Sequence, residues 1–283
     1  MNTFTTASQI ANERSAWSKP VAFVPTMGAL HEGHLSLFRQ ARERVGQEGT
    51  VVASIFVNPL QFDRASDLTD YPRTLEADLN FCEQEGVDHV FHPTAEEFYA
   101  NDHSIQVLEK KLANHLCGAS RPGHFDGVCT VVLKLFNLLT PDYAIFGKKD
   151  YQQLAIIRRM VRDLSLSVNI IGAETFREAD GLAMSSRNRN LTTTQRADSP
   201  RLRKALLAAQ NLAATGEQNP EKYLATARHQ LQGAPADFQL DYLELVSRDS
   251  LQPIASVTEP ALLAIAAFYD DVRLIDNIEI DAK

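Results

Sequence analysis

The chain has 283 residues and a formal net charge of −8, with 44% hydrophobic and 23% charged side chains. This length can bury a sizeable core in one or two domains, and the composition is typical of a globular protein. The negative charge argues against a general electrostatic binder of nucleic acid, and no apolar run is long enough to predict a membrane span.

Cys82, Cys117 and Cys129 are too few and too irregularly spaced for a disulfide framework or a CxxC-based zinc site. We expect reduced thiols. Residues 1–6 lack the basic region and the long apolar region of a signal peptide. The sequence therefore predicts a cytoplasmic protein.

Strand patterns alternate with helix patterns through the first two thirds of the chain. Short β-branched or apolar runs predict buried strands, and amphipathic runs that end near Gly or Pro predict helices. The predicted strands cover 21–24, 50–57, 87–91, 143–146 and 167–171, and the predicted helices cover 35–42, 74–84, 127–139 and 151–164. Such alternation predicts an α/β fold, with a parallel sheet that carries helices on both faces.

The composition changes after about residue 190. Ala/Leu/Gln-rich stretches predict helices over 192–215 and 220–232, and strands follow over 238–246, 261–268 and 272–278. Helices followed by strands indicate a small α+β domain. We place the boundary near 172–175, which divides the chain into domains 1–174 and 175–283.

Polar segments follow three of the predicted strands, at 26–34, 58–62 and 147–150. Ligands of open parallel sheets bind beyond the carboxyl ends of the strands. We therefore expect these segments to converge on one site.

The most informative segment is the turn His31-Glu32-Gly33-His34, between a predicted strand and a predicted helix. Backbone N–H groups at such a helix start can bind phosphate, and imidazoles at positions i and i+3 lie on one side of the helix. Two other interpretations remain: the histidines cap the helix locally, or they bind zinc. The zinc interpretation lacks a third ligand and the HExxH arrangement.

Two further segments carry phosphate-binding side chains. Ser185, Ser186 and Arg187 supply hydroxyl and guanidinium donors, although such a run alone is more typical of a polar surface turn. Lys149 can hold triphosphate charge, and Asp150 can reach a magnesium ion or simply cap the following helix.

Amide and basic side chains indicate a pocket for a small acid. Gln61 and Gln153 can grip its hydroxyls and carboxylate, while Arg121, His124 and Asp126 mark a candidate second pocket edge. Either glutamine by itself is more often an ordinary surface residue.

Taken in order, these segments closely resemble the pantothenate synthetase (pantoate–β-alanine ligase) family, a nucleotidyltransferase family with an HxGH motif. The resemblance covers 20–191 and rests on the motifs PTMGALHEGH, SIFVNPLQF, YPRT, RPGHFDGV, FGKKDYQQL and READGLAMSSRN. The part from 192 onward carries little motif information.

The resemblance implies a Rossmann-like domain, a smaller C-terminal lid domain and a homodimer. The strand over 50–57, as a candidate edge strand, is a weak internal hint of dimerisation. The implied reaction is the ATP-dependent condensation of D-pantoate with β-alanine to pantothenate, AMP and pyrophosphate, through a pantoyl adenylate, with Mg²⁺. No nucleic acid or membrane partner is implied.

The resemblance also implies roles for individual residues. His31, His34, Lys149 and Arg187 would be catalytic, with His34 often assigned as the general acid. ATP would contact Met27, Gly28, Ala29, Leu30, His31, Glu32, Gly33, His34, Gly147, Lys148, Lys149, Asp150, Phe176, Met184, Ser185, Ser186 and Arg187. Gln61 and Gln153 would bind pantoate, Gln61 would also bind β-alanine, and Asp150 would lie near the metal.

Two positions depart from the family pattern. Lys148 stands where Glu is more usual, and Ala77 lies in a segment that is more acidic in some members, so Asp78 is kept as a minor candidate. Two other functions remain as alternatives. One is an adenylyltransferase that moves AMP onto a phosphate-bearing substrate; the other is a non-catalytic nucleotide-binding protein. The paired glutamines favour a diol acid over a phosphate, and the intact basic residues favour catalysis.

Overall fold

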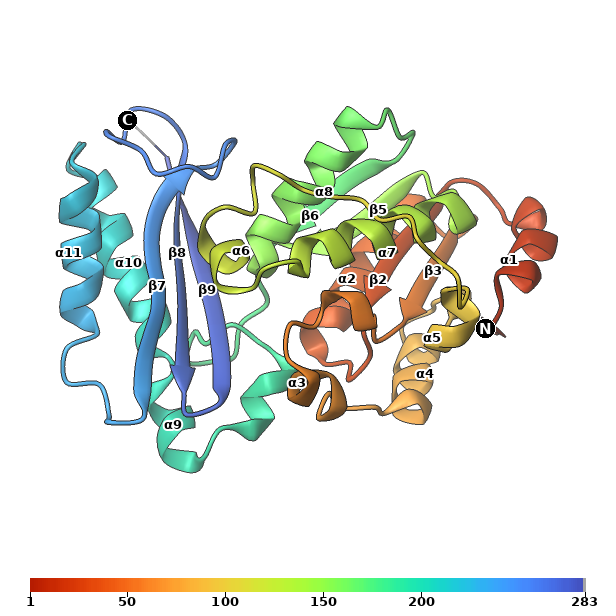
Figure 1. Cartoon of the computed structure of the whole chain (residues 1–283), viewed down its shortest axis with the longest axis horizontal. Helices are drawn as coiled ribbons and strands as arrows, with labels where there is room; N and C mark the ends of the chain where they lie inside the picture. Colours follow the sequence, from red (N-terminus) through yellow and green to blue (C-terminus); the bar gives the residue numbers. More distant parts are fainter. Residues whose placement is uncertain (282–283) are drawn as a thin grey trace. The chain divides into compact units, whose positions relative to one another are not determined.

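The computed structural model describes residues 1–281, apart from the side chains of residues 65 and 66. The chain forms two compact units (Figure 1). The first unit comprises Met1–Lys110, Arg121–Lys148 and Gln153–Glu174, and the second comprises Lys111–Ser120, Lys149–Gln152 and the chain from Thr175 onward.

The first unit contains a parallel six-stranded sheet with the order β1-β4-β3-β2-β5-β6. The strands are β1 (Asn2–Phe4), β2 (Val21–Thr26), β3 (Thr50–Ile55), β4 (His89–Phe91), β5 (Tyr143–Gly147) and β6 (Asn169–Ala173). The order grows from β2 toward β4 on one side and from β5 toward β6 on the other. The topological switch point of the sheet therefore lies between β2 and β5.

This order corrects two expectations. The strand over 50–57 is not an edge strand, because β3 pairs with β2 on one side and β4 on the other. It therefore offers no free edge for dimerisation. The short strand β1 was not predicted, because its three residues, one of them buried, carry too little pattern to recognise.

Helices cover both faces of this sheet, as predicted. The helical segments of this part are α1 (Ala7–Glu13), η1 (Arg14–Ala16), α2 (Glu32–Val45), η2 (Pro59–Gln61), α3 (Ala65–Thr69), α4 (Leu75–Gln84), α5 (Ala95–Phe98), α7 (His124–Leu139), η3 (Lys148–Asp150) and α8 (Tyr151–Asp163). Ala22 and Val24 pack with Phe38 of α2. Phe23 lies on the opposite face, edge-on to Phe136 of α7 with ring centroids 6.3 Å apart. The alternation of side chains along β2 thus supplies a core on each face.

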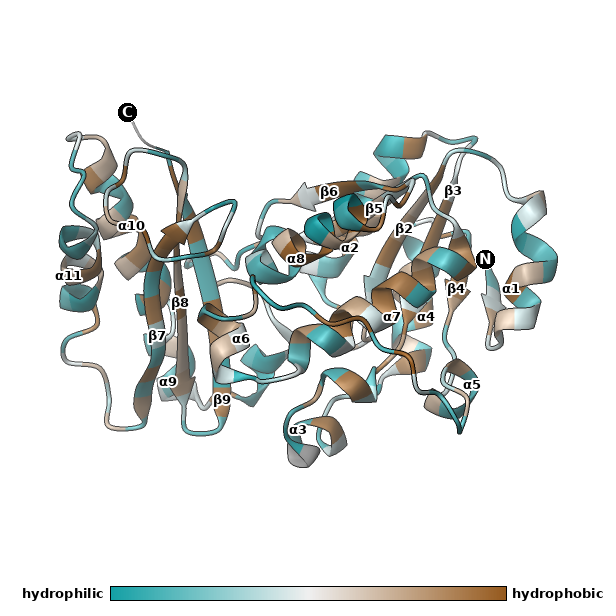
Figure 2. Cartoon of the chain, turned by 45° about the horizontal axis from the view of Figure 1, so that its top comes forward, coloured by the Kyte–Doolittle hydropathy of each residue, from teal (hydrophilic) through white to brown (hydrophobic). Residues whose placement is uncertain are grey.

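The second unit is an antiparallel sheet packed against helices. Its strands are β7 (Phe238–Ser247), β8 (Ala261–Tyr269) and β9 (Val272–Ile280), with β8 in the middle. Its helices are α6 (Leu116–Ser120), η4 (Ser186–Asn190), α9 (Thr193–Asp198), α10 (Arg201–Ala213) and α11 (Pro220–Gln230). Figure 2 shows β8 as largely hydrophobic; α10 packs against β8 and β9, and α11 packs against α10 and β7.

The helix predicted over 192–215 is broken in two. It ends at Asp198 and restarts at Arg201, because Pro200 has no N–H to donate and its ring clashes with the preceding turn. Pro200 instead precedes α10, where the missing N–H costs nothing.

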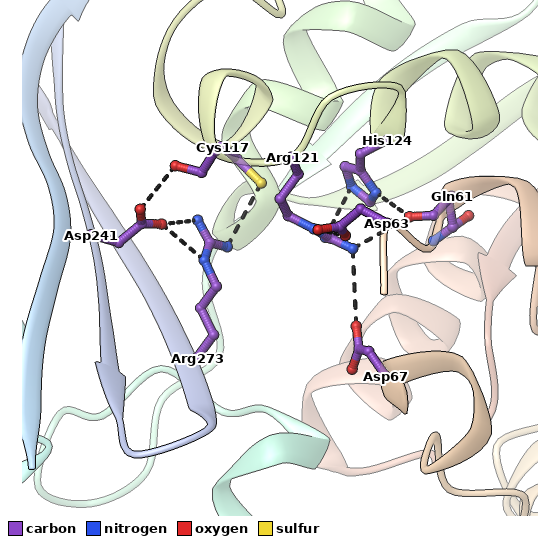
Figure 3. A network of polar contacts seen from close by, with 9 residues as sticks. Gln61, Asp63, Asp67, Cys117, Arg121, His124, Asp241 and Arg273 are labelled. Carbon is purple, nitrogen blue, oxygen red and sulfur yellow. Dashed lines mark hydrogen bonds and ion pairs between the residues drawn. The ribbon is translucent and has the colours of Figure 1, made fainter. Parts of the chain in front are cut away.

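Two segments expected in the first domain belong to the second unit. Segment Lys111–Ser120 is held there by the Leu116 N–H, which donates to Glu244 (3.2 Å). In the same unit Arg273 binds Asp241 at 2.7 Å and lies 3.7 Å from the sulfur of Cys117 (Figure 3). Segment Lys149–Gln152 is held by Asn277, whose amide donates to the Lys149 carbonyl (2.9 Å). Hydrogen bonds between residues far apart in sequence decide this grouping.

For the residues that it describes, the structure agrees with two expectations from the sequence, reduced cysteines and the lack of a membrane span. Cys82, Cys117 and Cys129 carry free thiols, and burial raises the pKa of Cys82 and Cys129 to about 12. Among residues 1–281, each helix is too short or too polar to cross a membrane.

An aromatic cluster near the amino terminus contains a buried imidazole. His89 stacks on Trp17 with ring centroids 4.7 Å apart, and Phe4 lies 5.7 Å from His89. Burial lowers the pKa of His89, against the opposing charges of Asp88 and Glu13. The folded state therefore favours the neutral ring.

We predict that His89 makes the protein less stable in mild acid. Above pH of about 6.5 the ring is neutral in both states and contributes nothing; below it the unfolded chain binds a proton that the folded chain resists. Urea unfolding at pH 7.5 and 5.5 should show a larger loss of stability for the wild type than for His89→Gln. Parallel pH dependence in the two proteins would contradict the assignment.

Candidate active site

The site begins where β2 ends. Thr26 is the last residue of β2, which lies between β3 and β5 in the sheet. Because all three strands are parallel, the segments that follow them leave from the same edge. Of the segments 26–34, 58–62 and 147–150, which we expected to converge, the first two and residues 147–148 therefore start from one edge of the sheet, whereas residues 149–150 group with the second unit.

The turn after β2 has an unusual backbone conformation. Gly28 and Ala29 have φ values of +83° and +49°, in the left-handed region. A Cβ atom on Gly28 would lie 2.9 Å from a carboxylate oxygen of Asp78. The glycine is therefore required both for the backbone angle and for the close approach of Asp78.

Asp78 on α4 binds the backbone of this turn. Its carboxylate is 1% exposed and accepts hydrogen bonds from the backbone N–H groups of Ala29 (2.9 Å) and Leu30 (2.8 Å). The hydroxyl of Thr74 donates to the same carboxylate at 3.1 Å, and no capping bond from Thr74 to α4 forms. These three donors satisfy a buried charge and fix the path of the chain into α2.

Sequence reasoning ranked Asp78 only as a minor candidate. An Asp in the first turn of a predicted helix is ordinary, since carboxylates stabilise helix N-termini. Its burial against a turn 48 residues away is visible only in the fold.

His31 and His34 lie together at the start of α2. Their ring centroids are 4.1 Å apart, and the His31 N–H approaches Nδ1 of His34 at 3.4 Å. An accepting Nδ1 leaves Nε2 as the protonated nitrogen of a neutral His34 ring. The local capping interpretation and the ligand-binding interpretation are therefore compatible, because the cap leaves the other nitrogen as a donor.

Glu32 has a different task from its neighbours. Its carboxylate pairs with Arg39 one to two turns along α2, and Arg39 also pairs with Glu85. Its side chain thus lies along the helix, while its backbone belongs to the first turn of α2.

Gln61 is anchored from two directions. Its amide nitrogen donates to the sulfur of Met27 at 3.0 Å, which joins it to the turn after β2. Its main-chain carbonyl oxygen accepts from Nδ1 of His124 (2.7 Å) and from Arg121 (3.3 Å), and Arg121 also binds Asp63 at 2.8 Å (Figure 3). We call Arg121 and His124 the carbonyl clamp.

The carbonyl clamp borders a polar pocket, as the sequence suggested for this region. His124 and Asp126 line it, together with Leu60, Asp63 and Gln106. Arg121 is not part of its lining. Burial is the largest single influence on Asp63 and acts to raise its pKa, but the hydrogen bond and the charge of Arg121, with smaller contributions, together outweigh it, so the pKa is lowered.

The structure does not join Gln153 to Gln61. Gln153 lies partly buried in the first turn of α8, and no hydrogen bond connects the two glutamines within the described residues. The neighbouring Gln152 is buried and donates to the carbonyls of Leu112 (2.7 Å) and His115 (2.8 Å). The adjacent residues Gln152 and Gln153 therefore have different surroundings, and this difference is visible only in the fold.

In the lysine-rich turn after β5, Lys148, Lys149 and Asp150 have different surroundings. Lys148 pairs with Glu174 at 2.5 Å, which joins the ends of β5 and β6. Lys149 lies 3.6 Å from the exposed carboxylate of Asp150. Residues 148–150 form a 3-10 turn before α8, so Asp150 lies within that turn rather than capping the helix in extended conformation.

The serine-rich segment is ordered within the second unit. The Met184 N–H donates to the Phe176 carbonyl (3.0 Å), which closes a short hairpin. Ser185 precedes η4 and accepts from the Arg187 N–H at 3.3 Å. Ser186 is buried, whereas the Phe176 ring is exposed.

A buried ion pair secures this hairpin. Arg177 binds both carboxylate oxygens of Asp276, at 2.8 and 2.9 Å, and Asp276 is 4% exposed. A bidentate pair of this kind is geometrically specific. It places Phe176 and Met184 at a defined position against β9.

The residues suited to a metal are few. Among residues 1–281 no group of three His, Cys, Asp or Glu side chains is arranged to hold an ion. Asp150 is an exposed carboxylate, and its neighbour Lys149 carries a positive charge of the kind that binds phosphate. This donor set fits Mg²⁺, which commonly keeps several waters and binds through one carboxylate and substrate phosphates.

A turn of this kind, between a strand and a helix at the switch point of a parallel sheet, is typical of nucleotide-binding α/β proteins. The family model for pantoate-beta-alanine ligase matches residues 1–279. A pantothenate synthetase from Akkermansia muciniphila is 53% identical over 286 aligned positions, which cover 99% of this chain and 100% of that protein. The chain therefore belongs to the pantoate–β-alanine ligase family.

Solved structures agree with this assignment. The crystal structure of pantothenate synthetase from Thermus thermophilus has a TM-score of 0.92 and 43% identity, covering 99% of this chain and 100% of that one. A pantoate-β-alanine ligase from Francisella tularensis, crystallised with β-γ ATP and β-alanine, has a TM-score of 0.80 and 33% identity, covering 98% and 97%.

We predict that Asp78→Asn weakens the turn after β2. An amide offers one acceptor oxygen in place of two, so a buried N–H of Ala29 or Leu30 loses its partner at a cost of about 1–3 kcal/mol. Urea unfolding should show this loss. Glu76→Gln is the matched control, because it removes an exposed carboxylate from the same helix turn. Equal effects of the two substitutions would contradict the role of Asp78.

Proposed function

We propose that the protein condenses D-pantoate with β-alanine at the expense of ATP, and yields pantothenate, AMP and pyrophosphate. The observation that supports this most is the pair of imidazoles at the start of α2, 4.1 Å apart, beside the switch point of the sheet. We infer the substrates from the ligase family, whose model matches residues 1–279.

The reaction needs activation because a carboxylate is a poor acceptor for an amine. In the first step, a pantoate carboxylate oxygen attacks the α-phosphorus of ATP, and the bond to the pyrophosphate oxygen breaks. In the second step, the unprotonated amine of β-alanine attacks the carbonyl carbon of the pantoyl adenylate. The C–O bond then breaks, AMP leaves, and the nitrogen loses a proton as the amide forms.

The first step gathers negative charge around the α-phosphorus. Donors held in place before the reaction stabilise such charge without reorganisation. Nε2 of His34 is such a donor, because its Nδ1 faces the His31 N–H. We assign His31 and His34 as transition-state donors to the α-phosphate, and Lys149 and Arg187 as further positive groups on the phosphates.

The second step depends on position more than on a strong base. Holding the amine against the acyl adenylate replaces an unfavourable encounter, and excluding water protects the activated acid. We assign Gln61 and Gln153 to pantoate, and Gln61 also to β-alanine. Closure of residues 175–283 as a lid belongs to the same proposal.

The ATP site of this proposal draws on four segments of the chain. It takes the turn from Met27 to His34, the run Gly147 to Asp150, the backbone beside Phe176, and the run Met184 to Arg187. Mg²⁺, bound to ATP near Asp150, would supply charge neutralisation on the phosphates. A homodimer in the cytoplasm completes the proposal.

The products decide between this activity and its alternatives. Incubation with ATP, D-pantoate and β-alanine should give AMP and pyrophosphate in equal amounts with pantothenate. Release of ADP would exclude an adenylate. AMP transfer to a phosphate-bearing acceptor without amide formation would favour an adenylyltransferase.

We predict that His34→Ala slows the first step by about 10²–10³-fold, the usual effect of removing one transition-state donor. Pantoate-dependent exchange of pyrophosphate into ATP measures that step alone. Stability should change little, since the ring is only partly buried. His229→Ala, on the exposed side of α11, is the control. Near-normal exchange in His34→Ala would refute the role.

A further inference from the structure

A buried hydrogen-bond network lies behind the amide of Gln61. Asn58 precedes η2 and is 1% exposed. Its amide nitrogen donates to the Gly127 carbonyl (3.1 Å) and to the side-chain oxygen of Gln61 (3.0 Å). Its oxygen accepts from the hydroxyl of Tyr99 (2.9 Å) and from the Leu60 N–H (3.3 Å).

The orientation of both amides follows from groups with a single role. The Leu60 N–H can only donate, and the Gly127 carbonyl can only accept, so the Asn58 oxygen faces the first and its nitrogen faces the second. The second N–H of the Asn58 amide then donates to the side-chain oxygen of Gln61. Gln61 must therefore turn its own nitrogen toward Met27, whose sulfur can only accept.

This arrangement makes Gln61 a donor at the site. Its side-chain oxygen is engaged with Asn58, and its NH₂ group faces the turn after β2. An NH₂ group selects an acceptor, such as a carboxylate or hydroxyl oxygen, and offers nothing to an ammonium group. Gln61 thus suits an oxygen of pantoate better than the charged amine of β-alanine.

Tyr99 is placed to maintain this orientation. It follows α5, is 8% exposed, and packs edge-on to Phe98 with the Lys134 ammonium 5.5 Å from its ring centroid. Burial raises the pKa of its hydroxyl, which therefore remains protonated and able to donate. The ring itself is anchored by packing, so the hydroxyl points to Asn58 without needing other support.

We propose that Tyr99 is a positioning residue for the substrate acid, which acts through Asn58 to hold Gln61 with its NH₂ group toward the site. The inference rests on the proposed function in one respect, the assignment of Gln61 to pantoate. Its physical basis is that the Tyr99 hydroxyl is one of two donors to the Asn58 oxygen. With the Leu60 N–H as the remaining donor, the Asn58 amide and the Gln61 amide that it binds are fixed less firmly before the substrate binds.

Tyr99→Phe tests the proposal, since it removes the hydroxyl and keeps the ring. We expect the KM for pantoate to rise about tenfold, the value of one hydrogen bond to a buried group, with the KM for ATP and kcat within about twofold. Tyr143→Phe is the matched control; Tyr143 begins β5, at the far end of the strand from Gly147, where Arg44 lies over its ring. It should leave both KM values unchanged.

A second comparison separates positioning from general structural damage. If Tyr99 acts through Gln61, then Tyr99→Phe should cause no additional loss of pantoate affinity in a Gln61→Ala background, measured by calorimetric titration with pantoate. Additive effects, or equal increases in the KM for ATP and pantoate, would overturn the proposal.

Gln61→Glu provides a test that leaves Tyr99 intact. A carboxylate cannot donate, so pantoate affinity should fall by at least the effect of Tyr99→Phe, while ATP affinity is retained. Unchanged pantoate affinity would also overturn the proposal. Absence of pantoate-dependent pyrophosphate release in the wild type would instead refute the proposed function, which keeps the two failures distinct.

Discussion

The buried carboxylate of Asp78 is the contact on which the site depends. It receives two backbone N–H groups of the turn after β2, one of them from Ala29 in the left-handed conformation. A buried charge is costly unless it is fully hydrogen-bonded, and here three donors satisfy it. The turn in turn sets the direction in which α2 begins, and with it the position of His31 and His34. A helix that contributes no proposed ligand thus determines the geometry of the residues proposed to bind phosphate.

The same principle applies to the side-chain amide of Gln61. Gln61 is held by the carbonyl clamp at its main chain and by Asn58 at its side chain. A side chain that is fixed from both sides loses little conformational freedom when a ligand binds. Tyr99, which binds Asn58, and His124, which binds the Gln61 carbonyl, come from separate segments that the first unit brings together. Preorganisation here is a property of the packing around the site.

The second unit secures its own polar segments by internal contacts. Arg177 and Asp276 tie the hairpin that precedes Ser185 to β9, and Asn277 on the same strand holds the main chain of Lys149. Both anchors lie on one strand, so β9 sets the spacing of two segments that carry proposed phosphate contacts. Lys148, the departure from the usual family pattern, pairs with Glu174 in the first unit. Because Glu174 is 83% exposed, this pair adds little stability.

The amino-acid sequence by itself determined the α/β class, the parallel sheet, the presence of C-terminal strands and the family, because each depends on local periodicity or on contiguous motifs. It also indicated the HxGH turn, whose chemistry lies within four adjacent residues. Only the tertiary structure decided the place of β3 inside the sheet, the break at Pro200 and the grouping of Lys111–Ser120 with the second unit. It alone showed that Asp78 supports the turn and that hydrogen bonds link Tyr99 through Asn58 to Gln61. These contacts join residues tens of positions apart, and their energy comes from burial and close donor–acceptor pairing, which no local pattern in the chain encodes.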